Sequence, residues 1–155
     1  MKFDDNFRKE LCKKDKTLMM VVGDVHRLFG HLIYDLITKK GIPNTVNCIL
    51  FHLVRNESLT QVEIVNKTHL RASTISVALQ KMESDGLIKR VSNDSDQRYL
   101  KVSITEDGYK LYSEMDKAIH EMDISLTSDI DKEELEIAKK VLKKISSKML
   151  EEENK

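Results

Sequence analysis

A short hairpin pattern that follows two short helices limits the fold of this chain more than any other feature. Residues 87–92 and 99–104 are strand-like, and the turn formers of residues 93–96 stand between them. The second strand alternates apolar with polar residues, as a half-buried strand does. Arg98 stands at the tip of the hairpin, which is a poor place for catalysis. Such a tip suits entry into a narrow, negatively charged groove.

Two short helices precede the hairpin. Thr60 and Glu63 have the spacing of a capping box at the start of the first helix, which we expect over residues 59–66. The second helix is expected over residues 72–84, and Gly86 suits the left-handed position that ends it. Its inner face carries Ile75, Leu79 and Met82. Helix, turn, helix and hairpin in this order predict a winged helix-turn-helix that binds duplex DNA.

Longer helical patterns flank this region, so the predicted fold class is mostly α with a small β-wing. A wide apolar stripe begins at Leu18 and stops before Gly41 and Pro43. Asn44 or Thr45 can cap the helix that follows. The apolar residues expected to face inward from that helix are Val46, Ile49, Leu50, Leu53 and Val54.

Two further helical patterns follow the hairpin. Thr105 can cap the first, and the second repeats at intervals of three and four residues from Leu135 to Met149. The inner stripe of the first is expected to contain Leu111, Met115, Ala118 or Ile119, Met122 and Leu126. Together with the stripe that begins at Leu18, these helices carry more apolar surface than a small winged domain can bury. A second copy of the chain is the simplest partner that could bury this surface, so we expect a homodimer.

These patterns divide the chain into three parts of a single intertwined domain. Residues 1–42 are expected to form an N-terminal arm and a dimerisation helix. Residues 43–104 form the winged helix-turn-helix, and residues 105–155 form the C-terminal helices that complete the dimerisation region. No internal repeat or low-complexity linker separates the three parts.

Composition sets weaker limits. The formal net charge is zero, and residues 59–104 carry seven basic and five acidic residues, a net charge of +2. Charge alone therefore does not indicate nucleic-acid binding. Cys12 and Cys48 lack the spacing of a zinc knuckle or a disulfide framework. The lack of a disulfide framework favours a reducing cytoplasm. The longest apolar stretch, residues 18–37, carries several charged residues that a membrane span would not tolerate, so we expect no membrane partner.

Several segments together resemble a known family, the MarR (multiple antibiotic resistance regulator) family. They are Leu59-Thr60-Gln61-Val62-Glu63-Ile64-Val65, Ser73-Thr74-Ile75-Ser76, residues 79–90 with Asp85-Gly86-Leu87-Ile88-Lys89-Arg90 at their end, Asp96-x-Arg98, and Ile104-Thr105-x-x-Gly108. The resemblance runs in detail from about Asn44 to Gly108. It implies a homodimeric transcription regulator, a repressor that binds a palindromic operator, with dimer contacts from the first and last helices. Many relatives lose DNA affinity on binding a small phenolic or lipophilic ligand.

The chain departs from the family pattern at three positions. Arg71 stands where a Ser or Asp cap is usual, which predicts a looser start of the recognition helix. Val65 replaces a small residue in the first helix of the motif. Val77 replaces a polar or basic residue, so the base preference should differ from that of many relatives.

The outer face of the recognition helix supplies the first set of candidate DNA-binding residues. They are Ser73, Thr74, Ser76, Val77, Gln80 and Lys81. Hydroxyl groups and free N–H groups near a helix start suit phosphates. Gln80 could bind an adenine edge, and Val77 could touch a thymine methyl group. The alternative for each residue is an ordinary solvated helix face.

The wing supplies the second set. Arg98 is the candidate for the minor groove, where narrow A·T tracts concentrate negative potential. Asp96 is expected to pair with Arg98 and hold its direction. The alternative is a surface ion pair that contributes ~0–1 kcal/mol and has no other role. Lys89, Arg90 and Lys101 flank the wing and can meet phosphates.

Other kinds of site have weaker support. The five histidines show no spacing of a closed metal site, and no cofactor is expected. Cys12 has lysine neighbours that could lower its thiol pKa for redox sensing, whereas Cys48 is expected in the core. No catalytic motif is present, so the chain is not predicted to be an enzyme. The alternative function is a winged-helix module for protein–protein contact, which the near-neutral charge favours and the Asp96/Arg98 pair disfavours.

Overall fold

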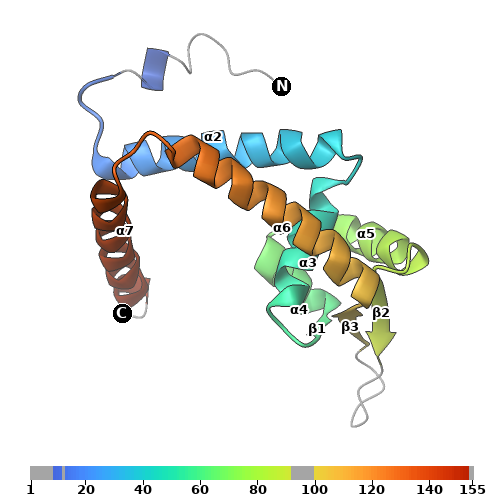
Figure 1. Ribbon diagram of the computed structural model, residues 1–155. Helices are drawn as coiled ribbons and strands as arrows, with labels where there is room; N and C mark the ends of the chain where they lie inside the picture. The colour runs from blue at the N-terminus through green and yellow to red at the C-terminus, as the bar shows by residue number, and fades with distance from the viewer. Residues whose placement is uncertain (1–8, 12, 92–99, 154–155) are drawn as a thin grey trace. The chain divides into compact units, whose positions relative to one another are not determined.

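The computed structural model describes residues 9–11, 13–91 and 100–153 (Figure 1). In chain order the elements are α2 (Leu18–Lys39), α3 (Asn44–Val54), β1 (Leu59–Thr60), α4 (Gln61–Thr68), α5 (Ala72–Ser84), β2 (Ile88–Val91), β3 (Lys101–Ile104), α6 (Glu106–Thr127) and α7 (Lys132–Glu153). The predicted class, mostly helical with a small β-wing, is confirmed. Within the described residues, no helix combines the length and apolar character that a membrane span requires.

The chain divides into two compact units, Met1–Asp116 and Lys117–Lys155. The first unit contains α2, the winged helix and the first half of α6. The second contains the rest of α6 and α7. The boundary between the two units falls in the middle of α6. It is a division by compactness, whereas the three parts predicted from the sequence were defined by their expected roles in DNA binding and dimerisation.

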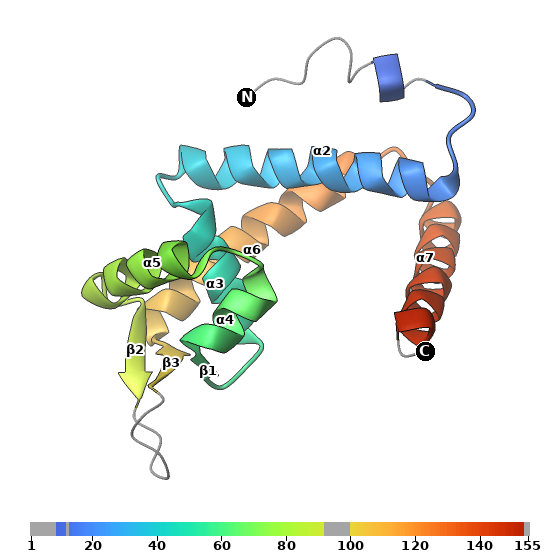
Figure 2. The same ribbon diagram turned by 180° about the vertical axis from the view of Figure 1, so that it is seen from behind.

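The core of the winged helix lies where α3, α4 and α5 meet the sheet (Figure 2). Its fully buried side chains include Ile49, Leu50, Leu53, Ile64, Ile75, Leu79 and Met82, with Ile88 and Val102 from the sheet. The inner face predicted for residues 72–84 is confirmed, and the helix has the predicted bounds. Each such side chain contributes roughly 1.5–3 kcal/mol when removed from water, so this contact fixes the position of α5.

The sheet has the strand order β1-β3-β2 and is antiparallel throughout. Its first strand corrects the sequence analysis, which placed Leu59 and Thr60 at the start of a helix. Thr60 has extended backbone angles (φ −72°, ψ 159°), and Leu59 pairs with Val102 of β3. The N-cap of a helix has extended rather than helical angles, so it can extend a strand as well as start a helix. The helix α4 then begins at Gln61 and ends at Thr68, two residues later than expected.

The capping box predicted at Thr60 and Glu63 is confirmed. The Glu63 N–H donates to the Thr60 hydroxyl oxygen at 3.2 Å, and the Thr60 N–H donates to a Glu63 carboxylate oxygen at 2.7 Å. The Thr60 N–H and the Thr60 hydroxyl both donate to the Glu63 carboxylate and hold the pKa of Glu63 below its usual range, because they stabilise the charged form. Glu63 therefore stabilises the fold above its ordinary pKa, and this contribution is lost as the pH falls through the lower, folded value.

We accordingly expect Glu63→Gln to be less stable than the parent chain at neutral pH, and the difference to narrow as the pH falls below about 4. Urea denaturation across that range measures both stabilities. Glu57→Gln, which removes an exposed carboxylate outside the capping box, is the control. A difference that stays constant with pH would show that the charged form of Glu63 does not matter.

The start of α3 is a second correction. Asn44 or Thr45 was expected to be the cap, but both are already helical and Pro43 is the N-cap, with φ −63° and ψ 137°. The ring of proline fixes φ near this value, which suits the residue next to a helix start. The predicted inner residues Val46, Ile49, Leu50 and Leu53 are buried, whereas Val54 is only partly covered.

Thr105 and Gly108 join the base of the wing to α6. The Thr105 hydroxyl donates to the Gly86 carbonyl at 2.6 Å and accepts from the Gly108 N–H at 3.1 Å, which confirms the predicted cap. The Thr105 N–H also donates to the Leu87 carbonyl at 3.1 Å. Gly86 has φ +73°, as expected for the residue that ends α5. The Thr-x-x-Gly motif is therefore a structural joint between α5, β2 and α6.

The α6 stripe was predicted in part. Met115 is buried, but Leu126 is 53% exposed within the chain. Tyr112, which the predicted stripe omits, is buried, and its hydroxyl donates to Asp116 at 3.1 Å. The same hydroxyl accepts a hydrogen bond from the Arg55 guanidinium at 3.2 Å. The tyrosine ring is therefore buried while its polar end has hydrogen-bond partners.

Candidate nucleic-acid interface

The recognition helix α5 begins without a side-chain cap. Arg71 is the N-cap residue (φ −65°, ψ 140°), and within the described residues no side chain bonds to the first turn of this helix. As the position of Arg71 suggested, the usual Ser or Asp cap is absent. The first N–H groups of a helix have no partner inside it, so these donors remain available at this end of α5.

The outer face of α5 carries the polar residues that the sequence assigned to it. Ser73, Thr74, Gln80 and Lys81 are exposed, Ser76 is partly exposed, and Val77 is 67% exposed. The face combines hydrogen-bond donors, one amide, one cation and one apolar contact, which are the groups that base edges and phosphates require.

A shallow cavity of about 480 Å³ lies beside this face, between α5 and the start of α3. Its lining residues are Pro43, Thr45, Val46, Ser73, Thr74, Val77, Ala78 and Lys81. Four of them were predicted as DNA-binding residues. Pro43 and Thr45 were not, because their approach to α5 depends on how α3 packs and has no signal in the local sequence.

Two of the predicted cations have carboxylate partners. Lys81 pairs with Asp85 at 2.6 Å, and Arg90 of β2 pairs with Glu83 of α5 at 3.0 Å. Both pairs are partly exposed to solvent, with side-chain exposures of 71% and 40% in the first pair and 32% and 41% in the second. Exposed pairs of this kind contribute about 0–1 kcal/mol, so a phosphate can compete for the cations.

The strand register places the three cations that were predicted to flank the wing on two different faces of the sheet. Lys89 is opposite Ser103, and Val91 is opposite Lys101, so Lys89 and Lys101 share one face of the sheet. Arg90 is opposite the buried Val102 and lies on the other face. Asp96 and Arg98 lie outside the described residues.

Two other candidate sites can be compared with the structure. Burial raises the pKa of the half-buried Cys48 thiol, which disfavours the reactive thiolate. Among the described residues, no group of three or more His, Cys, Asp or Glu side chains is placed to hold a metal ion. Cys12 lies outside the described residues.

The comparison with family models decides what kind of winged helix this is. Residues 40–98 match the model of the MarR family. The chain carries a MarR-family winged helix. The match covers the segments of the resemblance up to Arg98 and confirms the family, while the Ile104-Thr105-x-x-Gly108 segment lies beyond it.

A curated relative supports the same assignment. The chain is 33% identical over 73 residues to the organic hydroperoxide resistance transcriptional regulator of Bacillus subtilis (strain 168). The aligned part is 47% of this chain and 50% of that protein. The chain thus spans about half the length of the curated relatives it matches.

Solved structures share the MarR-type fold over most of the chain. Apo MarR from E. coli has a TM-score of 0.78 at 17% identity, covering 86% of this chain and 98% of the other. A mutant of S. aureus MepR bound to an oligodeoxyribonucleotide has a TM-score of 0.61 at 24% identity, covering 87% and 99%. NadR in complex with 4-hydroxyphenylacetate has a TM-score of 0.66 at 19% identity, covering 86% and 94%. At these identities the similarity shows the fold.

Proposed function

We propose that this protein is a sequence-specific, duplex-DNA-binding transcription regulator, and that it acts as a homodimeric repressor. The observation that carries the proposal is the outer face of α5. A buried inner face holds this helix rigidly, while its uncapped start and its outer row of hydroxyl, amide, ammonium and methyl groups face outward. A rigid helix with such a face fits the major groove.

Each part of the interface has a distinct role in this proposal. Ser73, Thr74 and Ser76 bind phosphates together with the free N–H groups at the start of α5. Gln80 binds an adenine edge, and Val77 contacts a thymine methyl group. The phosphate contacts set the position of the helix, and the base contacts select the sequence.

The wing and the sheet add further contacts. Arg98 enters the minor groove, and Asp96 holds its direction. Lys81, Lys89, Arg90 and Lys101 bind phosphates, with Arg90 leaving Glu83 and Lys81 leaving Asp85 as the DNA arrives. Because Arg90 lies on the opposite sheet face from Lys89 and Lys101, these cations meet different phosphates.

The comparisons support this proposal. The Bacillus subtilis relative is a transcriptional regulator by name, and the MepR mutant of similar fold was solved with an oligodeoxyribonucleotide. The NadR structure holds 4-hydroxyphenylacetate, a small phenolic acid. We propose by analogy that a small phenolic or lipophilic ligand lowers the DNA affinity of this protein.

The dimer is supported by apolar side chains that the single chain leaves exposed. On α2 these include Leu18, Met20 and Val25, at 52%, 53% and 59% exposure, and on α7 they include Leu142 and Met149, at 40% and 60%. Helices with so much exposed apolar surface generally have a partner. We expect sedimentation at micromolar concentration to show a dimer. A single monomer-sized species would contradict this part of the proposal.

The wing contact gives a direct test of DNA binding. Arg98→Ala should cost ~1–3 kcal/mol of operator affinity, the range of a groove contact, and leave the fold intact. Fluorescence anisotropy with a labelled duplex measures the affinity, and circular dichroism checks the fold. An unchanged affinity would remove the wing from the mechanism. It would favour the second candidate, a winged-helix module for protein contact, which the zero net charge supports.

A further inference from the structure

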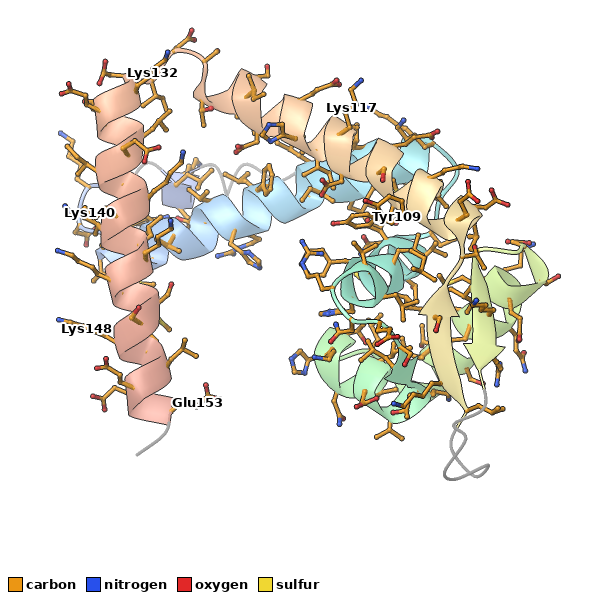
Figure 3. All side chains as sticks on the ribbon, turned by 60° about the horizontal axis from the view of Figure 1, so that its bottom comes forward. Tyr109, Lys117, Lys132, Lys140, Lys148 and Glu153 are labelled. Atoms are coloured by element: carbon orange, nitrogen blue, oxygen red, sulfur yellow. The ribbon has the colours of Figure 1, made fainter. Side chains whose placement is uncertain are left out.

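The middle of α7 concentrates positive charge in a chain whose formal net charge is zero. Residues 139–148 contain five lysines and no acidic residue. All five are exposed, and their side chains are among those drawn on α7 in Figure 3, where Lys140 and Lys148 are labelled. We call these five residues the lysine face: Lys139, Lys140, Lys143, Lys144 and Lys148.

The lysine face lies on the side of α7 opposite its apolar stripe. Successive helical residues are roughly 100° apart, so Lys140, in the middle of the lysine face, is roughly 200° from Leu142 of the apolar stripe. A shallow groove runs along the lysine side of the helix, lined by Glu136, Lys139, Lys140, Lys143, Lys144 and Ser147. A partner that covers Leu142 and the rest of the stripe from Leu135 to Met149 therefore leaves the lysine face in solvent.

The one acid that lines this groove neutralises a single lysine. Glu136 accepts from the Lys139 ammonium group at 2.9 Å. Four lysines then remain over residues 140–148, a length of roughly 12 Å along the helix. Duplex DNA carries roughly one phosphate charge per 1.7 Å, so a duplex offers enough phosphates to meet all four at once.

We propose that the lysine face of α7 is a second surface for duplex DNA, one that binds the phosphate backbone without regard to sequence. It goes beyond operator recognition by α5 and does not depend on it. A surface of this kind would hold the protein on DNA near its operator, because non-specific binding comes almost entirely from phosphate contacts.

The ends of α7 favour a duplex over an anionic membrane as the partner. Glu133, Glu134 and Glu136 precede the lysine face, and residues 151–153 are all glutamates. A helix that lies flat on a membrane brings both acidic ends to the lipid surface. A duplex that crosses the helix touches only its middle, where the lysines are. The helix also contains no aromatic residue, the type that commonly anchors interfacial helices.

The test uses the full chain and a labelled duplex of random sequence, with affinity measured by anisotropy over a range of salt concentrations. In the variant K140Q/K143Q/K144Q, the slope of log affinity against log salt should fall by about 2 to 3, because each lost phosphate contact removes about 0.9. The control variant K14Q/K110Q/K117Q has the same change in net charge on exposed lysines outside α7. It should leave the slope nearly unchanged.

Three results would overturn the proposal: an equal change in both variants, no change in the α7 variant, or no binding of the random duplex at low salt. Binding of the parent chain to phosphatidylserine vesicles that the α7 variant loses, with duplex binding unchanged, would assign the surface to membranes instead. Operator selectivity is measured separately, with Ser76→Glu in α5. If that variant keeps full selectivity, the proposed function fails while the result for α7 stands.

Discussion

Gly108→Ala is expected to destabilise the protein by about 3 kcal/mol or more, at or above the upper end of the range for overpacking a core. A Cβ atom at this position would lie 2.1 Å from the Leu87 carbonyl oxygen and 2.9 Å from a side-chain carbon of Ile104. The first contact is with backbone, which Thr105 already fixes through its hydrogen bonds to Gly86 and Leu87. The added Cβ atom can therefore be accommodated only if α6 moves away from the Leu87 carbonyl.

Gly30→Ala is the matched control. Gly30 is also helical, but no heavy atom of the described residues outside its own helix backbone and immediate neighbours lies within 4 Å of its added Cβ. Alanine is the better helix former by roughly 0.5–1 kcal/mol, so this variant should be slightly more stable than the parent chain. Thermal and urea denaturation measure both variants. Equal stability of the two alanine variants would show that the close contact at Gly108 does not constrain the fold.

Reversal of charge on the recognition helix is expected to have the largest effect on function. Ser76→Glu combined with Lys81→Glu places two negative charges on the outer face of α5, against phosphates in the proposed complex. Like charges that face each other across an interface cost several kcal/mol, so operator affinity should fall about 100-fold or more. Anisotropy with the labelled operator measures the loss.

Lys110→Glu is the control for this experiment. Lys110 lies on α6 and pairs with Glu106 at 3.0 Å, as Lys81 pairs with Asp85 four residues away. Both reversals therefore create a similar like-charge pair on a helix surface, worth a few tenths of a kcal/mol. If Lys110→Glu reduced operator affinity as strongly as the α5 variant, the effect would be one of net charge, and the assignment of α5 would be wrong.

Local patterns predicted the elements whose signals lie within a few residues. The bounds of α5, the capping box at Thr60 and Glu63, and the left-handed Gly86 all depend on neighbours in sequence, and all three are confirmed. Strand β1 was missed because its two residues gain their strand character from Val102, far later in the chain. Tyr112 was missed because the Arg55 guanidinium that donates to its hydroxyl comes from the C-cap of α3, far earlier in the chain.

The candidate interface divides in the same way. The inner and outer faces of α5 follow from helical periodicity, so Ser73, Thr74, Val77, Gln80 and Lys81 could be assigned from sequence. The cavity beside α5 could not, because it exists only where α3 packs against that helix. The two sheet faces that separate Arg90 from Lys89 and Lys101 also required the strand register.

The central claim is that α5 reads the sequence of duplex DNA, and selection from a pool of random duplexes tests it most directly. The parent chain should enrich an inverted repeat, with one half-site for each copy of α5 in the dimer. Gln80→Ala should enrich the same repeat with the preference relaxed at one position of each half-site, because a bidentate base contact discriminates by ~1–3 kcal/mol. Recovery of no common sequence by the parent chain, or of an identical sequence by both proteins, would contradict the claim.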